Sequence, residues 1–281
     1  MSEIPEGMDD FDATQFQKDN VAADAARELA NLVFVLDVQE ANPGITRLRD
    51  WTMAALAPQP GEVCVDVGCG TGADVRRFAE LVGPAGRAVG VEPHPGLRAV
   101  AAERAFGTSA EFVDGDALAL PFEDGSVDVL RCERVFQHLH DPGAAVREFA
   151  RVLAPGGRVA VVDSDWGSAI WLPMGDPDVR RRYDEAFFAR TPNPFAGRYL
   201  RPQLRAAGLA VDPDIGSSAL VFDEALVANP LMVRINASRA VEEGALTAEE
   251  AARLETDLVR AAELGEAFLA VTLFSVVGRK S

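Results

Sequence analysis

The chain is poor in cysteine and has no long apolar run. Its 281 residues include three cysteines without C-x-x-C spacing, so a disulfide framework is not expected. No run approaches the roughly 18 apolar residues of a membrane-spanning helix. The start, MSEIPEGMDDFDATQFQKDN, lacks the basic segment and apolar segment of a signal peptide. We therefore expect a cytoplasmic protein.

Positive charge is also scarce. The chain has 27 Lys and Arg against 44 Asp and Glu, for a formal net charge of −17. Such a surface repels phosphate backbones and anionic lipids, so nucleic acid and membranes are not expected as partners. The motifs G-x-S-x-G, G-x-x-x-x-G-K-[ST] and H-E-x-x-H are missing as well. We expect a monomer or homodimer with a small-molecule ligand.

Strand and helix patterns alternate through the middle of the chain. Apolar, β-branched runs predict strands over 62–68, 87–93, 110–117, 126–135 and 158–165. Amphipathic stretches between them predict helices over 72–83, 95–107 and 143–157. This rhythm is typical of right-handed βαβ units. It predicts an α/β, Rossmann-like fold with a mostly parallel, seven-stranded sheet and helices on both faces.

The flanking segments are mainly helical. Residues 1–20 are expected to form a mobile arm, followed by helices over 21–40 and 45–56. Beyond residue 165 we expect helices over 176–190, 199–209, 224–243 and 247–265, a strand within 210–222 and a last strand over 266–280. The predicted parts are an N-terminal arm with helices (1–57), a cofactor-binding core (58–165), a helical insertion acting as a substrate lid (166–265) and a closing strand (266–281).

The segment EVCVDVGCGTGADV contains a glycine loop between a strand and a helix. Gly68, Gly70 and Ala73 satisfy the dinucleotide pattern G-x-G-x-x-G/A, and Glu92 lies where a ribose-binding acid is found. Glycines let the backbone approach a ligand beside the positive end of the helix. That arrangement suits a pyrophosphate and a carboxylate equally, so the loop alone does not decide the ligand.

Three acids distinguish these ligands. Asp66, Glu92 and Asp116 end successive strands, so they share the edge where open α/β sheets bind ligands. Asp66 opposes a diphosphate and attracts an ammonium or sulfonium, Glu92 can accept both ribose hydroxyls, and Asp116 can accept from an adenine amino group. Each acid taken singly is also compatible with a solvated loop residue. Together they fit S-adenosylmethionine.

Four motifs then occur in order: VDVGCGTG, VGVEP, GDALALPFEDGSVDVLRCERVFQHLHDP and RVLAPGGRVAVVD. They resemble the class I S-adenosylmethionine-dependent methyltransferases, and within them the group that methylates quinone precursors and natural products. The resemblance covers residues 60–163, and the terminal LFSVVGRK is similar to the closing strand of that family.

The resemblance implies contacts to each part of the cofactor. These are Asp66, Gly68 and Gly70 at the methionine, Glu92 and Pro93 at the ribose, Asp116 and Ala117 at the adenine, and Cys132 along the other side. On the helix before the core, Arg49 is expected to pair with the methionine carboxylate. The product would be S-adenosylhomocysteine.

Methyl transfer needs a base only where the acceptor holds a proton. His138 follows the fourth strand and matches a position where many relatives carry histidine. We expect it to act as a base or to orient the substrate, with helix capping as the alternative. Asp163 is expected to orient His138 or take the proton itself, with a water-facing loop acid as the alternative. His138, His140 and Asp141 fit no standard metal-ligand spacing, so no metal is expected.

The acceptor pocket is expected between the N-terminal helices and the insertion, where aromatic and apolar residues gather: Trp166, Trp171, Phe187, Phe188, Phe195, Tyr199 and Met232. These residues are equally compatible with ordinary core contacts. The hypothesis is methylation of a small, hydrophobic or aromatic acceptor, with oxygen preferred over nitrogen or carbon. Two alternatives remain: a cyclisation or rearrangement in the same fold, and an NAD(P)-dependent oxidoreductase.

Overall fold

The centre of the molecule is a mixed eight-stranded sheet, seen in a computed structural model that describes residues 25–173, 175–222, 227 and 230–281. The strands are β1 (Val63–Val67), β2 (Arg87–Val91), β3 (Ala110–Val113), β4 (Val127–Glu133), β5 (Leu153–Leu172), β6 (Ala210–Val211), β7 (Gly216–Val221) and β8 (Phe268–Arg279). Their order is β3-β2-β1-β4-β5-β8-β6, with β7 paired to β8 off this path. The predicted Rossmann-like fold is confirmed, and β7 adds a strand to the predicted seven.

The parallel half of the sheet contains β3, β2, β1, β4 and β5, and β8 runs antiparallel to β5. β1, β2 and β4 are buried along almost their whole length, as expected of parallel strands covered on both faces. From β1 the chain winds outward to β2 and β3, whereas from β4 it winds to β5. The carboxyl ends of β1 and β4 therefore form a topological switch point, where folds of this kind bind ligands.

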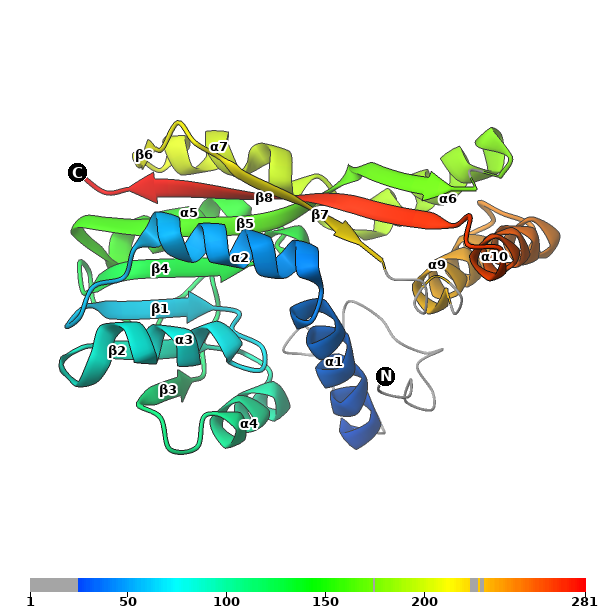
Figure 1. Cartoon of the computed structure of the whole chain (residues 1–281). Helices are drawn as coiled ribbons and strands as arrows, with labels where there is room; N and C mark the ends of the chain where they lie inside the picture. The colour runs from blue at the N-terminus through cyan, green and yellow to red at the C-terminus, as the bar shows by residue number, and fades with distance from the viewer. Residues whose placement is uncertain (1–24, 174, 223–226, 228–229) are drawn as a thin grey trace.

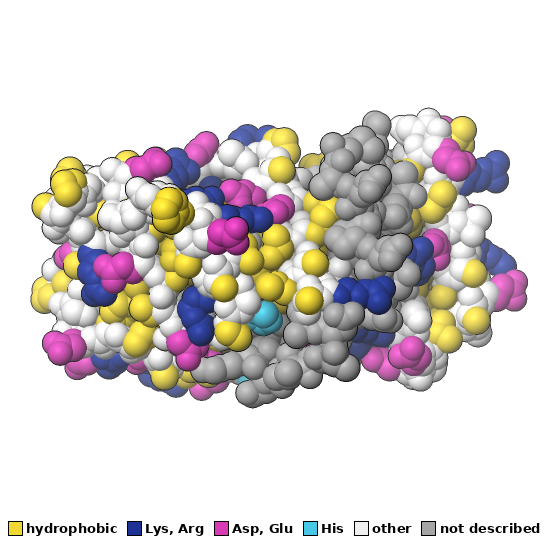
Figure 2. Space-filling model, turned by 90° about the horizontal axis from the view of Figure 1, so that it is seen from below, with side chains coloured by type: hydrophobic (Ala, Val, Ile, Leu, Met, Phe, Trp, Pro, Cys, Tyr) yellow, Lys and Arg dark blue, Asp and Glu magenta, His cyan; other side chains and the backbone are white. Residues whose placement is uncertain are grey.

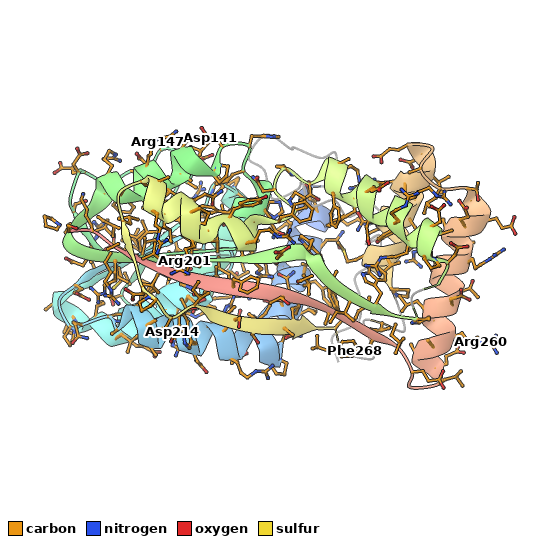
Figure 3. All side chains as sticks on the ribbon, turned by 90° about the horizontal axis from the view of Figure 1, so that it is seen from above. Asp141, Arg147, Arg201, Asp214, Arg260 and Phe268 are labelled. Carbon is orange, nitrogen blue, oxygen red and sulfur yellow. The ribbon has the colours of Figure 1, made fainter. Side chains whose placement is uncertain are left out.

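Helices cover both faces of the sheet (Figures 1 and 3). The helices of the described residues are α1 (Ala25–Glu40), α2 (Pro43–Leu56), α3 (Ala73–Val82), α4 (Pro95–Arg104), α5 (Pro142–Val152), α6 (Pro177–Arg190), α7 (Ala196–Ala206), α9 (Leu231–Glu242) and α10 (Ala248–Glu263), with the 3-10 turns η3 (Gly83–Ala85) and η4 (Phe136–His138). The helices α2 and α3 pack on one face, and α5 and α7 on the other. In Figure 1, α1 stands beyond the carboxyl end of β1.

Proline and a capping side chain mark several helix starts. Asn42 caps α2, with its Oδ1 accepting from the backbone nitrogens of Gly44 and Ile45, and Pro43 follows in the first turn. Asn42 Nδ2 also donates to the carbonyl of Val221 on β7, so the cap ties α2 to the sheet. This start fixes the position of α2 beside the switch point.

The strands β5 and β8 run beyond the parallel core. The sequence predicts a strand that ends at Asp165, but β5 continues to Leu172 through an irregularity between Asp165 and Ile170, because it stays paired to β8. With α6, α9 and α10, this continuation forms what we call the extension, at the right-hand end of Figure 1. It has a hydrophobic cluster of its own, which includes Tyr183 and Leu258.

Three predicted elements fall wholly or partly outside the described residues. The predicted mobile arm at 1–20 lies there, as do the beginnings of the helices predicted over 21–40 and 224–243.

Candidate cofactor and acceptor site

A cavity of about 390 Å³ lies at the carboxyl ends of β1, β2 and β4. The helices α1 and α2 close one side of it with Leu36 and Arg49. Most of the predicted site residues line it: Arg49, Asp66, Gly68, Gly70, Glu92, Pro93, Asp116, Ala117 and His138. The lining includes no described residue from 166–265, so the described part of the predicted lid does not contribute to this wall.

The loop between β1 and α3 is built on glycines with positive φ. Gly68 and Gly70 have φ of +70° and +54°. A Cβ on Gly68 would lie 2.4 Å from Cγ2 of Val135, and one on Gly70 would lie 3.1 Å from Cδ1 of Leu36. Both of those neighbours line the cavity. The glycines therefore keep the backbone free to approach a ligand between these walls.

Glu92 ends β2 and is 5% exposed. Its Oε2 accepts from the backbone nitrogen of Gly70 at 3.0 Å, and its Oε1 accepts from that of His94 at 2.9 Å. Burial raises the pKa of Glu92 to about 7, although these two hydrogen bonds act to lower it. The carboxyl group is thus held against the glycine loop, and each oxygen keeps a lone pair for a ligand hydroxyl.

The loop after β3 supplies the far end of the cavity. Asp116 is exposed, and its Oδ1 accepts from the backbone nitrogen of Leu118 at 2.7 Å, whereas Ala117 is buried. Asp116 and Ala117 line the cavity together with Pro93, which directly follows Glu92 in the chain. The structure therefore brings the predicted ribose and adenine contacts together.

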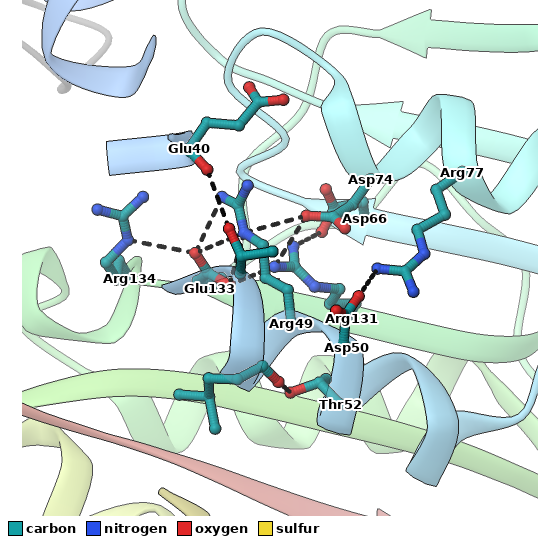
Figure 4. A network of polar contacts seen from close by, with 12 residues as sticks. Glu40, Arg49, Asp50, Thr52, Asp66, Asp74, Arg77, Arg131, Glu133 and Arg134 are labelled. Atoms are coloured by element: carbon teal, nitrogen blue, oxygen red, sulfur yellow. Dashed lines mark hydrogen bonds and ion pairs between the residues drawn. The ribbon is translucent and has the colours of Figure 1, made fainter. Parts of the chain in front are cut away.

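A buried charge network underlies the cavity (Figure 4). Arg131 on β4 lies 2.9 Å from Oδ1 of Asp66 and 3.0 Å from Oδ2 of Asp74, and it also donates to Glu133. These four side chains are only 3–7% exposed. Burial raises the pKa of Asp66 to about 6, although Arg131 acts to lower it.

Asp66 is therefore not the unpaired carboxylate that the sequence indicates. Arg131 is its direct partner in the β1–β4 register and compensates its charge. Because Arg131 compensates its charge, Asp66 by itself opposes a diphosphate less strongly than the sequence indicates. Arg131 and Glu133 alternate with apolar residues in VDVLRCERV, so they lie on one face of β4. This alternation is the signal that could have revealed the network.

Arg49 on α2 belongs to the same network. Its Nη2 and Nε donate to Oε1 of Glu133 at 3.0 and 3.2 Å, and its Nε lies 3.5 Å from Oδ2 of Asp74. Burial acts to raise the pKa of Glu133. Three nearby guanidinium groups outweigh it and hold that pKa at about 2: those of Arg131, Arg49 and Arg134. Arg49 lies in the cavity wall as predicted, but its guanidinium already forms ion pairs with the carboxylates of Asp74 and Glu133.

The turn η4 places His138 in the cavity wall. Its backbone nitrogen donates to the carbonyl of Val135 at 2.9 Å. Burial, aided by repulsion from Arg134, lowers the pKa of His138 to about 4. The imidazole is neutral at neutral pH and can accept a hydrogen bond. The next residue back, Gln137, also lines the cavity and accepts at Oε1 from Nε1 of Trp166 at 2.9 Å.

Asp163 is fully buried and lies outside the cavity lining. Its Oδ2 accepts from the backbone nitrogen of Gln137 at 3.2 Å, and its Oδ1 accepts from that of Ser164 at 2.8 Å. Burial raises the pKa of Asp163 to about 7. The side chain thus supports the turn that carries His138, and it is neither a water-facing acid nor placed to take a proton from the cavity.

Two other sequence predictions differ from the observed positions. Cys132 was expected beside the cofactor, but its side chain points to the opposite face of β4 from Arg131 and packs in the apolar core. The seven aromatic and apolar residues expected around the acceptor are outside the cavity lining. Several of them contact one another edge to face instead, with Trp166 and Phe187 at 5.2 Å between ring centroids.

Among the described residues, no group of three or more His, Cys, Asp and Glu side chains could hold a metal ion. No helix in the part of the chain that the structure describes has the length and apolar character to cross a membrane.

The doubly wound sheet and its glycine loop define a Rossmann-like fold with a nucleotide-type cofactor site. Residues 65–161 match the family described as "Methyltransferase domain". Residues 65–161 thus form a methyltransferase domain, which confirms the predicted resemblance for this part of the chain.

Curated relatives share this domain. The chain is 36% identical to an uncharacterized 37.1 kDa protein in transposon TN4556 of Streptomyces fradiae, over 80% of this chain and 64% of the relative. It is 31% identical to a ubiquinone/menaquinone biosynthesis C-methyltransferase of Hahella chejuensis, over 53% of this chain and 59% of the relative. It is 38% identical to the tocopherol O-methyltransferase of Arabidopsis thaliana, over 35% of this chain and 29% of the relative. The chain spans less than two thirds of the length of these relatives.

Solved structures share the fold. A putative methyltransferase from Bacillus halodurans superposes with a TM-score of 0.60 at 20% identity, covering 84% of this chain and 99% of that one. A geranyl diphosphate methyltransferase in complex with SAM superposes with a TM-score of 0.51 at 16% identity, covering 94% of this chain and 93% of that one. The domain match and the neighbours solved with SAM or sinefungin support S-adenosylmethionine as the cofactor.

Proposed function

We propose that the chain is a methyltransferase that transfers the methyl group of S-adenosylmethionine to a small, hydrophobic or aromatic acceptor, with oxygen as the receiving atom. One observation carries this proposal. The Gly68–Gly70 loop, Glu92 and Asp116 line one cavity, and they follow the neighbouring strands β1, β2 and β3, an order that suits a methionine, a ribose and an adenine. Residues 58–165 would bind the cofactor, and α1 and α2 would close it in.

The residues present fit this cofactor. The free lone pairs of Glu92 suit the two ribose hydroxyls, and Asp116 suits the adenine amino group. The methionine end carries both an ammonium and a carboxylate, and the network beneath the glycine loop offers both kinds of partner. Asp66 would take the ammonium and Arg49 the carboxylate. When bound, the cofactor supplies an electrophilic methyl group on its sulfonium.

A small-molecule acceptor is supported by charge and by the relatives. The net charge of −17 opposes nucleic acid and anionic membranes as partners. The names of two relatives, a ubiquinone/menaquinone C-methyltransferase and a tocopherol O-methyltransferase, are those of small-molecule enzymes. We propose that the protein works in the cytoplasm as a monomer or homodimer.

His138 would contact the acceptor. Its imidazole lies in the cavity wall, on a turn that Asp163 holds through Gln137. A neutral imidazole can accept a hydrogen bond and orient an acceptor for in-line attack, which contributes through positioning. Cys132 would act only through packing behind the site.

The test is product mass. The protein is incubated with methyl-labelled S-adenosylmethionine and a panel of phenols, quinones and aromatic acids. We expect a product in which one hydrogen has been replaced by the labelled methyl, and His138→Ala should reduce turnover more than His140→Ala at the cavity rim. A product isomeric with its substrate would instead indicate a cyclisation or rearrangement. A solved neighbour titled as a [4+2]-cyclase shows that this fold does not by itself imply methyl transfer.

A further inference from the structure

Arg134 is held in the cavity wall by an uncommon backbone conformation. It follows β4 directly, has φ of +56°, and donates its backbone nitrogen to the carbonyl of Val162 at 2.7 Å. Residues other than glycine avoid this left-handed region, and such strain gathers at ligand sites. The conformation turns the Arg134 side chain out of the strand pattern and places it on the cavity wall.

Arg134 is also the least compensated of the three arginines in the network. Arg131 contacts three carboxylates and Arg49 contacts two. Within the described part of the chain, Arg134 has one ion-pair partner, Glu133, whose Oε1 lies 3.4 Å from Nε, and that Nε has no hydrogen bond. The Arg134 side chain is only 11% exposed. Arg134 Nε is therefore a buried donor without a hydrogen bond, and its guanidinium has fewer carboxylate partners than those of Arg131 and Arg49.

The terminal nitrogens of Arg134 lie on the opposite side of Glu133 from the other acids of the network. In Figure 4, Glu133 separates Arg134 from Asp66 and Asp74, and the terminal nitrogens of Arg134 point away from Glu133. The carbonyl of Arg134 accepts from Nε2 of Gln137 at 3.3 Å, at the turn that carries His138. An anion bound to these nitrogens would therefore lie beside His138, away from the proposed methionine site.

We propose that Arg134 binds an oxyanion of the acceptor, either a carboxylate or a phenolate. This proposal rests on the proposed methyl transfer. A lone pair of the bound oxygen forms the new O–CH₃ bond while the C–S bond of the sulfonium breaks and its electron pair stays on sulfur. No proton leaves in this step, so it needs no general base. His138 then orients the acceptor by a hydrogen bond.

This assignment agrees with the state of His138. Burial and Arg134 lower its pKa to about 4, which makes the imidazole a weak base for a neutral phenol. If the acceptor binds in its ionised form, the site does not need a stronger base. The same guanidinium that weakens His138 as a base would favour the ionised form of a phenol.

The carboxylate of the cofactor is the other anion that Arg134 could bind. We place the acceptor there because Arg49 lies nearer the acids of the methionine end, 3.5 Å from Asp74. The two sources are separated by measuring cofactor and acceptor binding in the same variants.

The experiment uses benzoate and its neutral isostere benzamide as acceptor probes. Their dissociation constants are measured by ligand-observed NMR on protein saturated with S-adenosylhomocysteine, and that of S-adenosylhomocysteine by calorimetry. The variants are Arg134→Met, Arg134→Lys and the control Arg147→Met, which removes a surface guanidinium that is 67% exposed. Figure 3 shows Arg147 on the outside of the molecule.

We expect wild type and Arg147→Met to bind benzoate about 10-fold to 100-fold more tightly than benzamide. Arg134→Met should lose this preference with S-adenosylhomocysteine affinity nearly unchanged, and Arg134→Lys should keep part of it. Equal binding of the two probes by wild type would overturn the inference. So would an Arg134→Met variant that loses S-adenosylhomocysteine affinity and keeps the benzoate preference, since Arg134 would then bind the cofactor. A wild type that fails to bind S-adenosylhomocysteine would instead contradict the proposed function.

Discussion

Ion pairs differ between the cofactor-binding core and the extension. In the core, Arg131 and Asp66 are each 3% exposed and lie 2.9 Å apart. In the extension, Arg253 and Glu249 lie at a similar 3.0 Å, but their side chains are 66% and 83% exposed. An ion pair exposed to water contributes little to the free energy of unfolding, even when it is short. Removing one partner of a buried pair is costly, because it leaves the other charge buried and uncompensated.

The comparison indicates where this molecule depends on particular charged residues. The extension is held by its own hydrophobic cluster and by strand pairing, so its surface charges can vary. The core has placed three guanidiniums and three carboxylates beneath a cavity: Arg49, Arg131, Arg134, Asp66, Asp74 and Glu133. Such an arrangement costs free energy of desolvation and is understandable if a charged ligand uses it.

The largest effect is expected from Arg131→Met. It leaves the carboxylates of Asp66 and Asp74 buried without their main partner, so the free energy of unfolding should fall by about 3–5 kcal/mol. Urea denaturation measures it, and Arg253→Met is the matched control, for which we expect almost no change because its ion pair is exposed. Equal effects of the two substitutions would show that the buried network is not structurally important.

A smaller effect is expected from Gly68→Ala. Its methyl group would lie 2.4 Å from Val135, whose β-branched side chain is stiff, so an overpacking cost of about 1–3 kcal/mol adds to the backbone strain. Gly107→Ala is the control, because φ there is +84° with nothing within 4 Å, leaving only strain of about 1–2 kcal/mol. Only Gly68→Ala should also weaken S-adenosylhomocysteine binding in calorimetry. Loss of that binding in Gly107→Ala would contradict the assignment of the loop.

Glu92→Gln tests the burial of the ribose-binding acid through pH. The pKa of Glu92 is raised from 4.5 to about 7, so between these values the folded state binds more protons than the unfolded state. Wild type should therefore lose stability relative to Glu92→Gln as pH rises through this window, by up to about 1.4 kcal/mol per pH unit. Urea denaturation of both proteins across the window measures the difference, in which the other buried acids largely cancel. A constant difference would mean that Glu92 is not buried as described.

The smallest effects are expected at two helix caps, one in each region. Asn42→Ala and Thr247→Ala each remove a side chain that accepts from the first turn of a helix, so each should cost about 1 kcal/mol. Only Asn42 caps the helix that carries Arg49. We expect S-adenosylhomocysteine affinity to fall in Asn42→Ala and to stay unchanged in Thr247→Ala. A similar loss in both would mean that cofactor binding simply follows global stability.

Sequence patterns were sufficient to predict the meeting of Glu92 and Asp116. Both follow parallel strands, and the carboxyl ends of such strands share one edge wherever the crossovers are right-handed. The glycines at 68 and 70 were identifiable for a similar reason, since a strand, a tight loop and a helix leave few conformations for the turn.

Long-range pairing explains what the sequence could not show. The compensation of Asp66 depends on the β1–β4 register, which puts Arg131 beside it across 65 residues of chain. The continuation of β5 depends on pairing with β8, roughly a hundred residues later. Likewise, Asp163 supports the turn of His138 only because η4 folds back onto the middle of β5. Each is a contact between segments that are distant in the sequence, and the local pattern of one segment does not predict its pairing with the other.

Calorimetric titration of the wild-type protein with S-adenosylhomocysteine and, separately, with NAD tests the central claim most directly. We predict saturable binding of S-adenosylhomocysteine that is greatly weakened by Glu92→Ala, and no binding of NAD. Saturable NAD binding without a response to S-adenosylhomocysteine would contradict the assignment of the cavity.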